Sequence, residues 1–213
     1  TTDAAKKHKG IIALCVETSS KGFSVSKVEK KLGIKASSTA QLFFDKVFVP
    51  DENVIAPEGE GFKVAMHTLD GGRIGIAAQA LGIAQGAYES ALNYSHEREA
   101  FGKPIAHHQM IMVYLADMAT RIEAARQLVY RASWAKQEHY ENDGPRHTQE
   151  ASMAKLYAGD TAMWVSERAI QVLGGYGYTK EFPVERFFRD AKITQIYEGT
   201  QEVQRIVISR SLK

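Results

Sequence analysis

The sequence has few of the features that mark secreted, membrane-spanning or nucleic-acid-binding proteins. It contains a single cysteine, so no disulfide can form within the chain, and Cys15 in the apolar run 11–16 is expected to be a buried core thiol. No uninterrupted apolar stretch reaches the length of a transmembrane helix. The 27 basic and 25 acidic residues give a formal charge of +2, and no long basic run offers a track for a polyanion. We therefore expect a soluble protein of a reducing compartment that binds neither nucleic acid nor membrane.

The sequence also lacks an initiator methionine. It begins Thr1-Thr2-Asp3 and enters a strand-like segment almost at once, so we expect a fragment or a processed product. With 44% hydrophobic residues in 213, it has enough apolar material for one sizeable core or two smaller ones.

The first part of the chain, up to about Ile55, has the pattern of β-strands. Short apolar or alternating runs at 10–16, 23–26, 42–44 and 47–49 predict strands, separated by glycine and proline. So few strands cannot bury both faces of a sheet. Residues 1–57 are therefore predicted to be a remnant of a larger β-sheet domain.

The rest of the chain, residues 58–213, has helical periodicity and predicts a mainly α protein. Long helices are expected from Glu60 to near His96, at 105–139 and at 148–173, with shorter ones near Pro183 and after Gly199, where Thr200 can cap. Long helices joined by short turns predict an antiparallel bundle. The stripe expected to face the core in the second helix is Met110, Val113, Met118, Ile122, Ala125, Leu128 and Val129.

Two segments carry unusual residues between and within the long helices. Asp70-Gly71-Gly72-Arg73 places two glycines inside a helix, each costing about 1 kcal/mol relative to alanine. This indicates either close helix packing or a surface where a ligand meets bare backbone beside Asp70 and Arg73. In the turn 98–104, Arg98 offers a planar fork suited to phosphate oxygens. The neighbouring His96, His107 and His108 lack metal-ligand spacing and are expected to be solvated.

Two further segments lie near the carboxyl end. The glycines of 171–178 follow a helix, so they indicate either a helix C-cap or a close approach of phosphate or flavin, with Gln171 as a donor. In 195–202, Glu198 stands before a flexible glycine at the start of the last helix. Such an acid is commonly only a partner of the helix dipole, but Tyr197, Gly199 and Thr200 around it also suit a general base.

Together these segments resemble the acyl-CoA dehydrogenases, most of all the short-chain or butyryl-type members. The resemblance rests on Arg-x-x-Phe-Gly at 98–102, Gln-x-x-Gly-Gly at 171–175, Arg-Asp-Ala-Lys-Ile at 189–193 and Ile-Tyr-Glu-Gly-Thr at 196–200. It extends upstream through 32–39 and 61–66 and so covers essentially the whole chain.

The resemblance implies FAD-dependent α,β-desaturation of a short- to medium-chain acyl-CoA, with Glu198 as the base. The Glu198 backbone N–H and a flavin hydroxyl would bind the thioester carbonyl. Electrons would pass to an electron-transfer flavoprotein, and the subunits would form a dimer of dimers in a bacterial cytoplasm or a mitochondrial matrix. The implied substrate contacts are Asp70, Gly71, Gly72, Arg73, Tyr197, Gly199 and Arg210. The implied FAD contacts, partly from a neighbouring subunit, are Arg98, Phe101, Gln109, Gln171, Val172, Leu173, Gly174, Gly175, Thr200, Gln201 and Glu202.

The sequence departs from the family pattern in its extent. The amino-terminal helical domain and the first part of the β domain have no counterpart, so we expect that the isolated chain cannot hold FAD productively. Isovaleryl-type relatives place the base immediately before the helix arginine, where this chain has Gly72, which leaves Glu198 unopposed. A non-catalytic helical oligomerisation module and an acyl-CoA oxidase remain alternatives.

Overall fold

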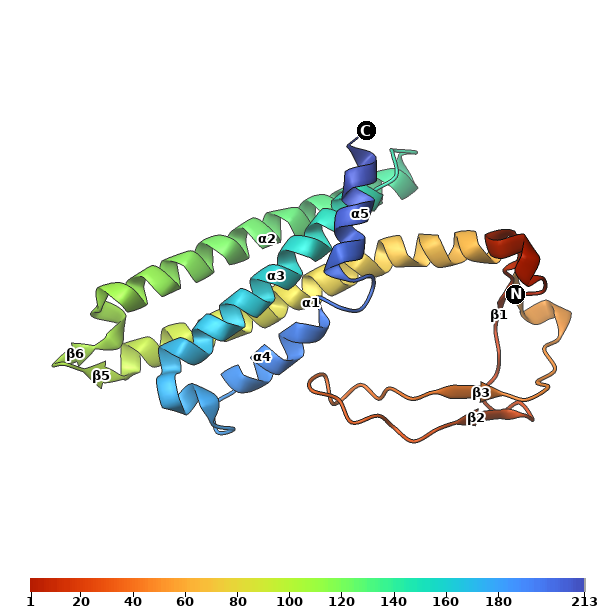
Figure 1. The fold of residues 1–213 in the computed structure, drawn as a ribbon. Coiled ribbons are helices and arrows are strands. Elements are labelled where there is room, and N and C mark those ends of the chain that lie inside the picture. The colour runs from red at the N-terminus through yellow and green to blue at the C-terminus, as the bar shows by residue number, and fades with distance from the viewer. Residues whose placement is uncertain (213) are drawn as a thin grey trace. The chain divides into compact units, whose positions relative to one another are not determined.

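The computed structural model describes residues 1–212 and divides into two compact units. Unit 1 comprises Thr1–Lys31 and Lys35–Leu69, and unit 2 comprises Leu32–Ile34 and Asp70–Lys213. The boundary between domains expected at residues 57 and 58 stays a prediction. The helix α1 (Gly61–Glu97) contributes to both units, since its residues up to Leu69 belong to unit 1 (Figure 1).

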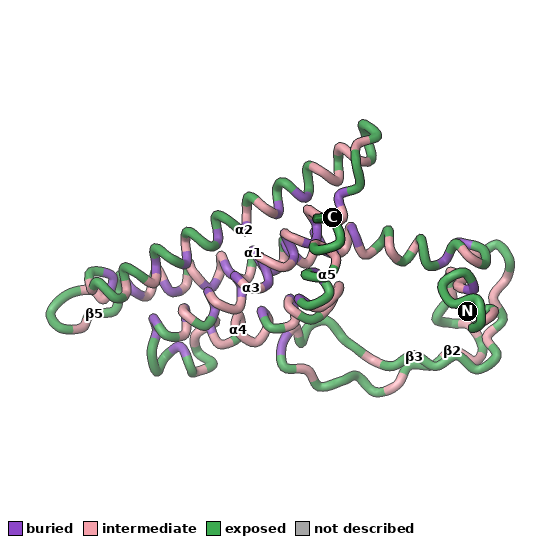
Figure 2. Tube along the Cα trace, turned by 45° about the horizontal axis from the view of Figure 1, so that its top comes forward, coloured by how far each residue is buried: buried purple, intermediate pink, exposed green. Residues whose placement is uncertain are grey.

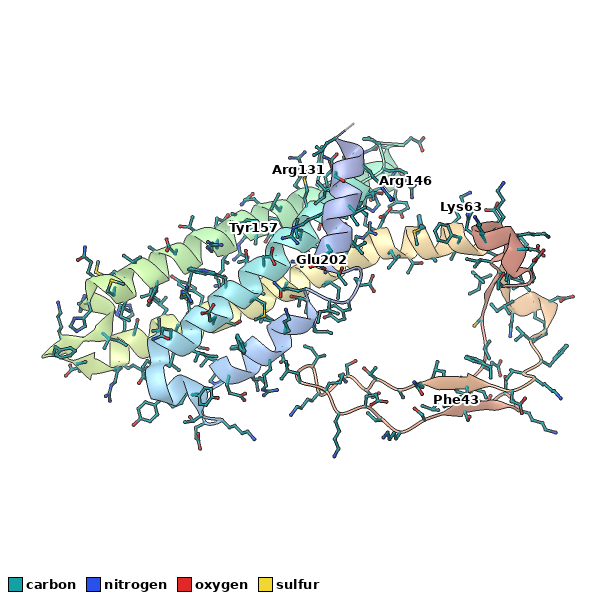
Figure 3. All side chains as sticks on the ribbon, viewed as in Figure 1. Phe43, Lys63, Arg131, Arg146, Tyr157 and Glu202 are labelled. Carbon is teal, nitrogen blue, oxygen red and sulfur yellow. The ribbon has the colours of Figure 1, made fainter. Side chains whose placement is uncertain are left out.

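Unit 1 contains two separate antiparallel ribbons. Strand β1 (Ala13–Leu14) pairs with β4 (Val54–Ala56), and β2 (Phe23–Val25) pairs with β3 (Leu42–Phe44). Two 3-10 helices, η1 (Ala4–Gly10) and η2 (Asp51–Asn53), complete the unit. A two-stranded ribbon cannot cover its own faces, and Phe43 on β3, labelled in Figure 3, is 52% exposed.

Two sequence predictions for this unit are wrong. Cys15 is exposed, and the two-residue strand β1 that it follows pairs only with β4 among residues 1–212. The run 47–49 forms no strand, whereas the later segment Val54–Ala56 forms β4 and pairs with β1. The alternation of apolar residues indicated extended chain, but it could not indicate which extended segment finds a partner.

Unit 2 is an antiparallel helical bundle, which confirms the mainly α fold. After α1, the hairpin β5 (Glu99–Ala100) and β6 (Lys103–Pro104) and the 3-10 turn η3 (Ile105–His107) reverse the chain into α2 (Gln109–Glu141). A second reversal leads to α3 (Thr148–Leu173). The chain then passes through η4 (Gly174–Tyr178), α4 (Val184–Ile193) and α5 (Gln201–Ser211), and both of these last helices pack on α3 (Figure 1).

Alanine dominates the bundle core. Small side chains let helix axes approach closely, so little apolar volume is needed to fill the space between them. The buried positions follow the inner faces of the long helices (Figure 2). The fully buried alanines, all 0% exposed, are Ala77, Ala80, Ala84, Ala87, Ala91, Ala125, Ala132, Ala151, Ala154, Ala158, Ala162, Ala169 and Ala191.

The second long helix starts later than its periodicity predicts. The segment 105–107 is a separate 3-10 turn, and Met110 and Val113 at the start of α2 are 64% and 46% exposed. Leu115 and Ala132 are buried instead, in one stripe with Met118, Ile122, Ala125 and Val129. No helix within residues 1–212 is long and apolar enough to cross a membrane.

The short segment Leu32–Ile34 is bound to α4. The Asp190 carboxylate accepts a hydrogen bond from the Ile34 backbone N–H at 2.6 Å, and Arg189 donates to the Leu32 carbonyl at 2.9 Å. A Cβ at Gly33 would lie 2.5 Å from the Arg189 carbonyl oxygen. Two segments singled out in the sequence, 32–39 and 189–193, therefore meet at this contact.

Candidate active site

The loop between α4 and α5 carries Glu198 in an unusual backbone conformation. Glu198 has φ +53° and Gly199 has φ +88°, so two consecutive residues are in the left-handed region. For a residue with a side chain this conformation costs on the order of 1–2 kcal/mol. Thr200 then caps α5, as expected, and its hydroxyl accepts from the Val203 backbone N–H at 3.4 Å.

The Glu198 carboxylate points at the bare backbone of α1. Its Oε2 is buried and has no hydrogen-bond partner within residues 1–212. A Cβ built on Gly72 would lie 2.4 Å from this oxygen and 2.9 Å from Cδ. Gly72 is therefore a close-packing glycine, and what packs against it is the carboxylate of the predicted base.

Two buried side chains hold the carbonyl groups of this loop. Gln204, one turn into α5 and 0% exposed, donates from Nε2 to the carbonyls of Glu198 at 3.2 Å and Gly199 at 3.0 Å. Lys155 on α3, also 0% exposed, donates from Nζ to the Gly199 carbonyl at 2.6 Å. A side chain at position 199 would collide with Gln204, because a Cβ there lies 2.5 Å from Nε2.

Lys155 is a cation with little solvent around it. Burial lowers the pKa of Lys155 to about 8, while the negative charges of Asp160, Glu202 and Glu198 act in the opposite direction and Arg73 adds to the lowering. Its ammonium also lies 3.4 Å from Oε1 of Gln201.

Gln201 is tied into the same network. It is 5% exposed and donates from Nε2 to the Leu156 carbonyl at 2.8 Å and to Asp160 at 2.9 Å. Its side chain thus makes internal bonds at both ends, whereas Glu202, labelled at the start of α5 in Figure 3, is exposed. The Thr200 hydroxyl and the local backbone N–H lower the pKa of Glu202, the backbone contribution being the larger. The flavin contacts predicted for positions 200–202 stay predictions.

Tyr197 ties the loop to α1 a second time. Its phenol oxygen hydrogen-bonds Oε1 of Gln79, two turns after Gly72 on the same helix. Burial raises the pKa of the Tyr197 phenol, the hydrogen bond to Gln79 acts in the opposite direction, and the negative charge of Glu198 adds to the rise. Tyr197 therefore stays neutral at physiological pH and forms a half-buried aromatic wall beside the carboxylate.

The pair Asp70 and Arg73 lies one turn apart on α1 and is almost fully buried. Arg73 donates to Asp70 Oδ1 at 2.8 Å and lies 3.5 Å from the Ser152 hydroxyl, while Thr148 donates to Asp70 Oδ2 at 2.7 Å. Arg146, labelled in Figure 3 where α2 leads into α3, lies 3.5 Å from the same carboxylate oxygen. In this arrangement the pair fastens α1 to α3, and its predicted contact with CoA stays a prediction.

Most of the other predicted flavin residues gather at a pocket far along the bundle. This pocket of about 720 Å³ lies between the end of α1, the β5–β6 hairpin and the end of α3. Arg98 is its cationic residue and is exposed. The pocket is lined by Tyr94, Arg98, Ala100, Phe101, Ile105, His108, Ile111, Val172, Leu173, Gly174, Gly175, Tyr176 and Thr179.

The rim of this pocket carries strained and bare backbone. Phe101, with φ +52°, and Gly102, with φ +81°, form the tip of the hairpin, and the Phe101 ring is 96% exposed. Gly174, with φ +60°, caps α3, and a Cβ at Gly174 or Gly175 would meet no atom of the described residues 1–212 within 4 Å. Packing within that part of the chain therefore does not require these two glycines. They serve the C-cap and leave backbone accessible.

The remaining predicted residues are nearby or elsewhere. Gln109 is the first residue of α2 and Gln171 lies in the last turn of α3, and both are exposed beside the pocket without lining it. Arg210 is exposed in the last turn of α5. His108 is not simply solvated as expected, because its Nε2 is bonded to the Ala100 carbonyl oxygen at 2.9 Å and its ring is half-buried.

The structure thus brings the predicted residues together in two places rather than one. Gly72, Tyr197, Glu198 and Gly199 meet at the first site, and the residues around Arg98 meet at the second. Gly72 lies on α1, which ends at Glu97, and Arg98 follows directly after the helix. The 25 positions from Gly72 to the end of α1 correspond, at 1.5 Å per residue, to about 38 Å. One small molecule cannot contact both places within a single chain.

Sequence reasoning missed three residues that shape the first site, namely Lys155, Gln204 and Gln79. Lys155 carried a usable signal, since a lysine lies on the buried face of α3 between Ala151, Ala154 and Ala158. A charged residue inside an apolar stripe needs a polar partner, which predicts a neighbouring site. Gln204 and Gln79 gave no comparable signal, because glutamine is common on exposed helix faces.

Residues 59–213 match the family model described as acyl-CoA dehydrogenase, C-terminal domain. The short-chain specific acyl-CoA dehydrogenase of Clostridium acetobutylicum is 55% identical over 208 residues, covering 98% of this chain and 54% of that protein.

Solved structures agree with this match. The butyryl-CoA dehydrogenase of Megasphaera elsdenii superposes with a TM-score of 0.95 at 53% identity, covering 99% of this chain and 54% of that one. A chain in a structure described as the electron transferring flavoprotein of Acidaminococcus fermentans gives 0.94 at 52% identity, covering 99% and 54%. The chain spans about half the length of these relatives. It belongs to the acyl-CoA dehydrogenase family, and residues 59–213 match the family's C-terminal domain.

Proposed function

We propose that this chain carries the catalytic base of a FAD-dependent acyl-CoA dehydrogenase acting on short- to medium-chain thioesters. The observation that carries the proposal is the Glu198 carboxylate, whose Oε2 is buried, unpartnered within residues 1–212 and in contact with bare backbone at Gly72. Buried polar atoms almost always have partners, so an orphaned carboxylate oxygen calls for an explanation. A general base must leave an oxygen free to take a proton, and this one does.

The backbone N–H of Glu198 is also placed to stabilise the charge that forms when the proton is removed. No hydrogen-bond partner for the Glu198 N–H is found within residues 1–212, whereas the carbonyls of Glu198 and Gly199 are both bonded. A free N–H next to the base can donate to the thioester carbonyl and stabilise the enolate-like charge that develops as the α proton leaves. Glu198 would then remove the proton with its side chain and stabilise the resulting charge with its backbone.

The pocket at Arg98 fits part of a flavin dinucleotide. Its mainly apolar lining suits a planar ring, and no ion pair neutralises Arg98 within residues 1–212, so its guanidinium is available to phosphate oxygens. The open backbone at Gly174 and Gly175 admits a ligand without steric conflict. Arg98, Phe101 and residues 172–175 would hold the cofactor, with Gln109 and Gln171 beside them. When bound, FAD supplies the acceptor for the β hydrogen.

The distance between the Glu198–Gly72 contact and the pocket at Arg98 supports an oligomer. About 38 Å of α1 separates Gly72 from the end of the helix next to Arg98, so the pocket of one chain and the base of the same chain would serve different flavins. Phe101, almost fully exposed beside the pocket, suits a surface covered by another subunit. We expect a dimer of dimers that passes electrons to an electron-transfer flavoprotein, in bacterial cytoplasm or mitochondrial matrix.

The experiment compares two forms of the protein. The full-length enzyme containing this chain is expected to bind FAD, and butyryl-CoA should bleach the flavin in the absence of oxygen. The isolated chain should purify without flavin absorbance. Dye reduction by the isolated chain with butyryl-CoA would contradict the need for a counterpart of the relatives' remaining length.

The base is tested in the full-length enzyme with a matched pair of substitutions. Glu198→Gln should lower the rate of flavin bleaching by at least about a thousandfold while acyl-CoA still binds, because the amide cannot accept the proton. Glu123→Gln, at an exposed acid on α2 outside both sites, should leave it unchanged. Full-length enzyme with no bleaching at all would favour the non-catalytic oligomerisation module, and fast reaction of the reduced flavin with oxygen would favour the oxidase.

A further inference from the structure

Glu198 is held in a backbone conformation that it does not favour by itself. Non-glycine residues in the left-handed region persist only where their surroundings over-determine them. Here φ of +53° at Glu198 is followed by +88° at Gly199, and together these angles direct the carboxylate toward Gly72. The loop therefore needs restraint from outside its own sequence.

The restraint acts on the two carbonyl groups of the loop. Gln204 shares one amide between the Glu198 and Gly199 carbonyls, at 3.2 and 3.0 Å. Lys155 makes the shorter contact, 2.6 Å from Nζ to the Gly199 carbonyl oxygen. A hydrogen bond from an ammonium group is charge-assisted and stronger than one from an amide, so Lys155 is the dominant restraint on this peptide.

Burying the ammonium group of Lys155 costs free energy that an apolar residue at the same position would not cost. Lys155 is 0% exposed, and the neighbouring buried positions of its helix hold small residues, namely Ala151, Ser152, Ala154, Ala158 and Gly159. A buried ammonium is unfavourable unless it is hydrogen-bonded. Lys155 is in no salt bridge within residues 1–212, and its oxygen partners are the Gly199 carbonyl and the Gln201 amide. Its hydrogen bonds are therefore directed at the loop and the first residue of α5.

We propose that Lys155 is a positioning residue for Glu198. Its Nζ holds the Gly199 carbonyl, which keeps the Glu198 carboxylate against Gly72 and leaves the Glu198 N–H free. This inference rests on the proposed function, because it assigns Lys155 a role through the base.

Removing Lys155 would affect the chemical step more than binding. Among residues 1–212, Gln204 would remain the only donor to the two carbonyls, and the loop would relax out of the left-handed region. Misplacement of a reacting group by about 1 Å can reduce a rate by about a hundredfold. The pocket at Arg98 is at the other end of the bundle and would keep its shape, so flavin binding there should persist.

The test uses full-length holoenzyme carrying Lys155→Met, which keeps a long apolar side chain and removes the donor. Stopped-flow measurement of flavin reduction over a range of butyryl-CoA concentrations separates the limiting rate from the apparent Kd. The limiting rate per bound flavin should fall about 10- to 100-fold, with Kd changed less than about threefold. Thr161→Val is the control, since it removes another buried α3 polar group that has no partner within residues 1–212. Its limiting rate should match that of the wild type.

The outcomes are distinct from those of the proposed function. If Glu198→Gln abolishes bleaching but Lys155→Met retains a limiting rate within about twofold of wild type, the role of Lys155 is refuted while that of Glu198 stands. A loss confined to thermal stability or flavin content, with the rate per bound flavin preserved, assigns Lys155 a structural role only and also refutes the proposal. Should Lys155→Met yield no holoenzyme, Lys155→Gln, which is shorter and uncharged, replaces it with the same expected loss.

Discussion

Gly72→Ala is predicted to raise stability while lowering activity. Alanine stabilises an exposed helix interior by about 0.5–1 kcal/mol relative to glycine. At position 72, however, the new methyl group would lie 2.4 Å from Glu198 Oε2, 2.9 Å from Cδ and 3.3 Å from Oε1. The carboxylate is the end of a flexible side chain, so it moves aside rather than distorting α1.

That movement displaces the base by roughly 1 Å, enough to bring the atoms to normal contact distance. The limiting rate of flavin reduction should then fall about 10- to 100-fold. Gly75→Ala is the matched control on the same helix, because a Cβ there meets nothing within 4 Å. Gly75→Ala should give a similar gain in helix propensity, measured as a rise in Tm of about 1–4 °C, with no loss in the limiting rate of flavin reduction. Equal rates for the two alanine variants would refute the contact between Gly72 and Glu198.

Burial lowers the pKa of Lys155 from 10.5 to about 8, although the charges of Asp160, Glu202 and Glu198 act in the opposite direction. Between these two pH values the unfolded chain binds more protons than the folded one, so the stability of the wild type should rise with pH relative to that of Lys155→Met. Thermal melts in which both proteins show the same pH dependence would contradict this. Asp70→Ala should lower the free energy of unfolding by about 3 kcal/mol, because it leaves Arg73 buried without its partner. Glu167→Gln, at an exposed acid paired with the half-buried Arg168, should change it by less than about 0.5 kcal/mol, and denaturant titrations measure both. Arg98→Leu should weaken FAD binding at least about tenfold in flavin titrations without changing the limiting rate at saturating FAD, and unchanged affinity would remove Arg98 from the cofactor site.

The helical part of the fold was predictable because its signals are local. Periodicity and end signals give 148–173 its observed bounds, and Pro183 and Thr200 indicate the starts of α4 and α5. The wrong predictions concern segments whose burial or strand pairing depends on residues far away in the sequence. Cys15 and the run 47–49 have apolar patterns, but burial and pairing depend on strands that only the fold can supply.

In the candidate site, too, local motifs could be found in the sequence, whereas contacts between distant residues could not. The motif around Glu198 could be found in the sequence, but its contact with Gly72 joins positions 126 residues apart along the chain. The two glycines at 71 and 72 were left open between packing and ligand contact, and at Gly72 the packing partner is the Glu198 carboxylate. Asp70 and Arg73 bind each other and α3 in the structure, which the sequence did not indicate, and their contact with a ligand stays a prediction.

The central claim is that Glu198 takes the α proton, and proton exchange tests it most directly. Full-length enzyme is incubated with butyryl-CoA in D₂O without an electron acceptor, and deuterium at C2 of the thioester is followed by NMR or mass spectrometry. Wild type and Glu123→Gln should incorporate deuterium at C2, since the base exchanges its proton with solvent and returns it, whereas Glu198→Gln should show no incorporation above the uncatalysed rate. Incorporation by Glu198→Gln at the wild-type rate would show that another group removes the proton.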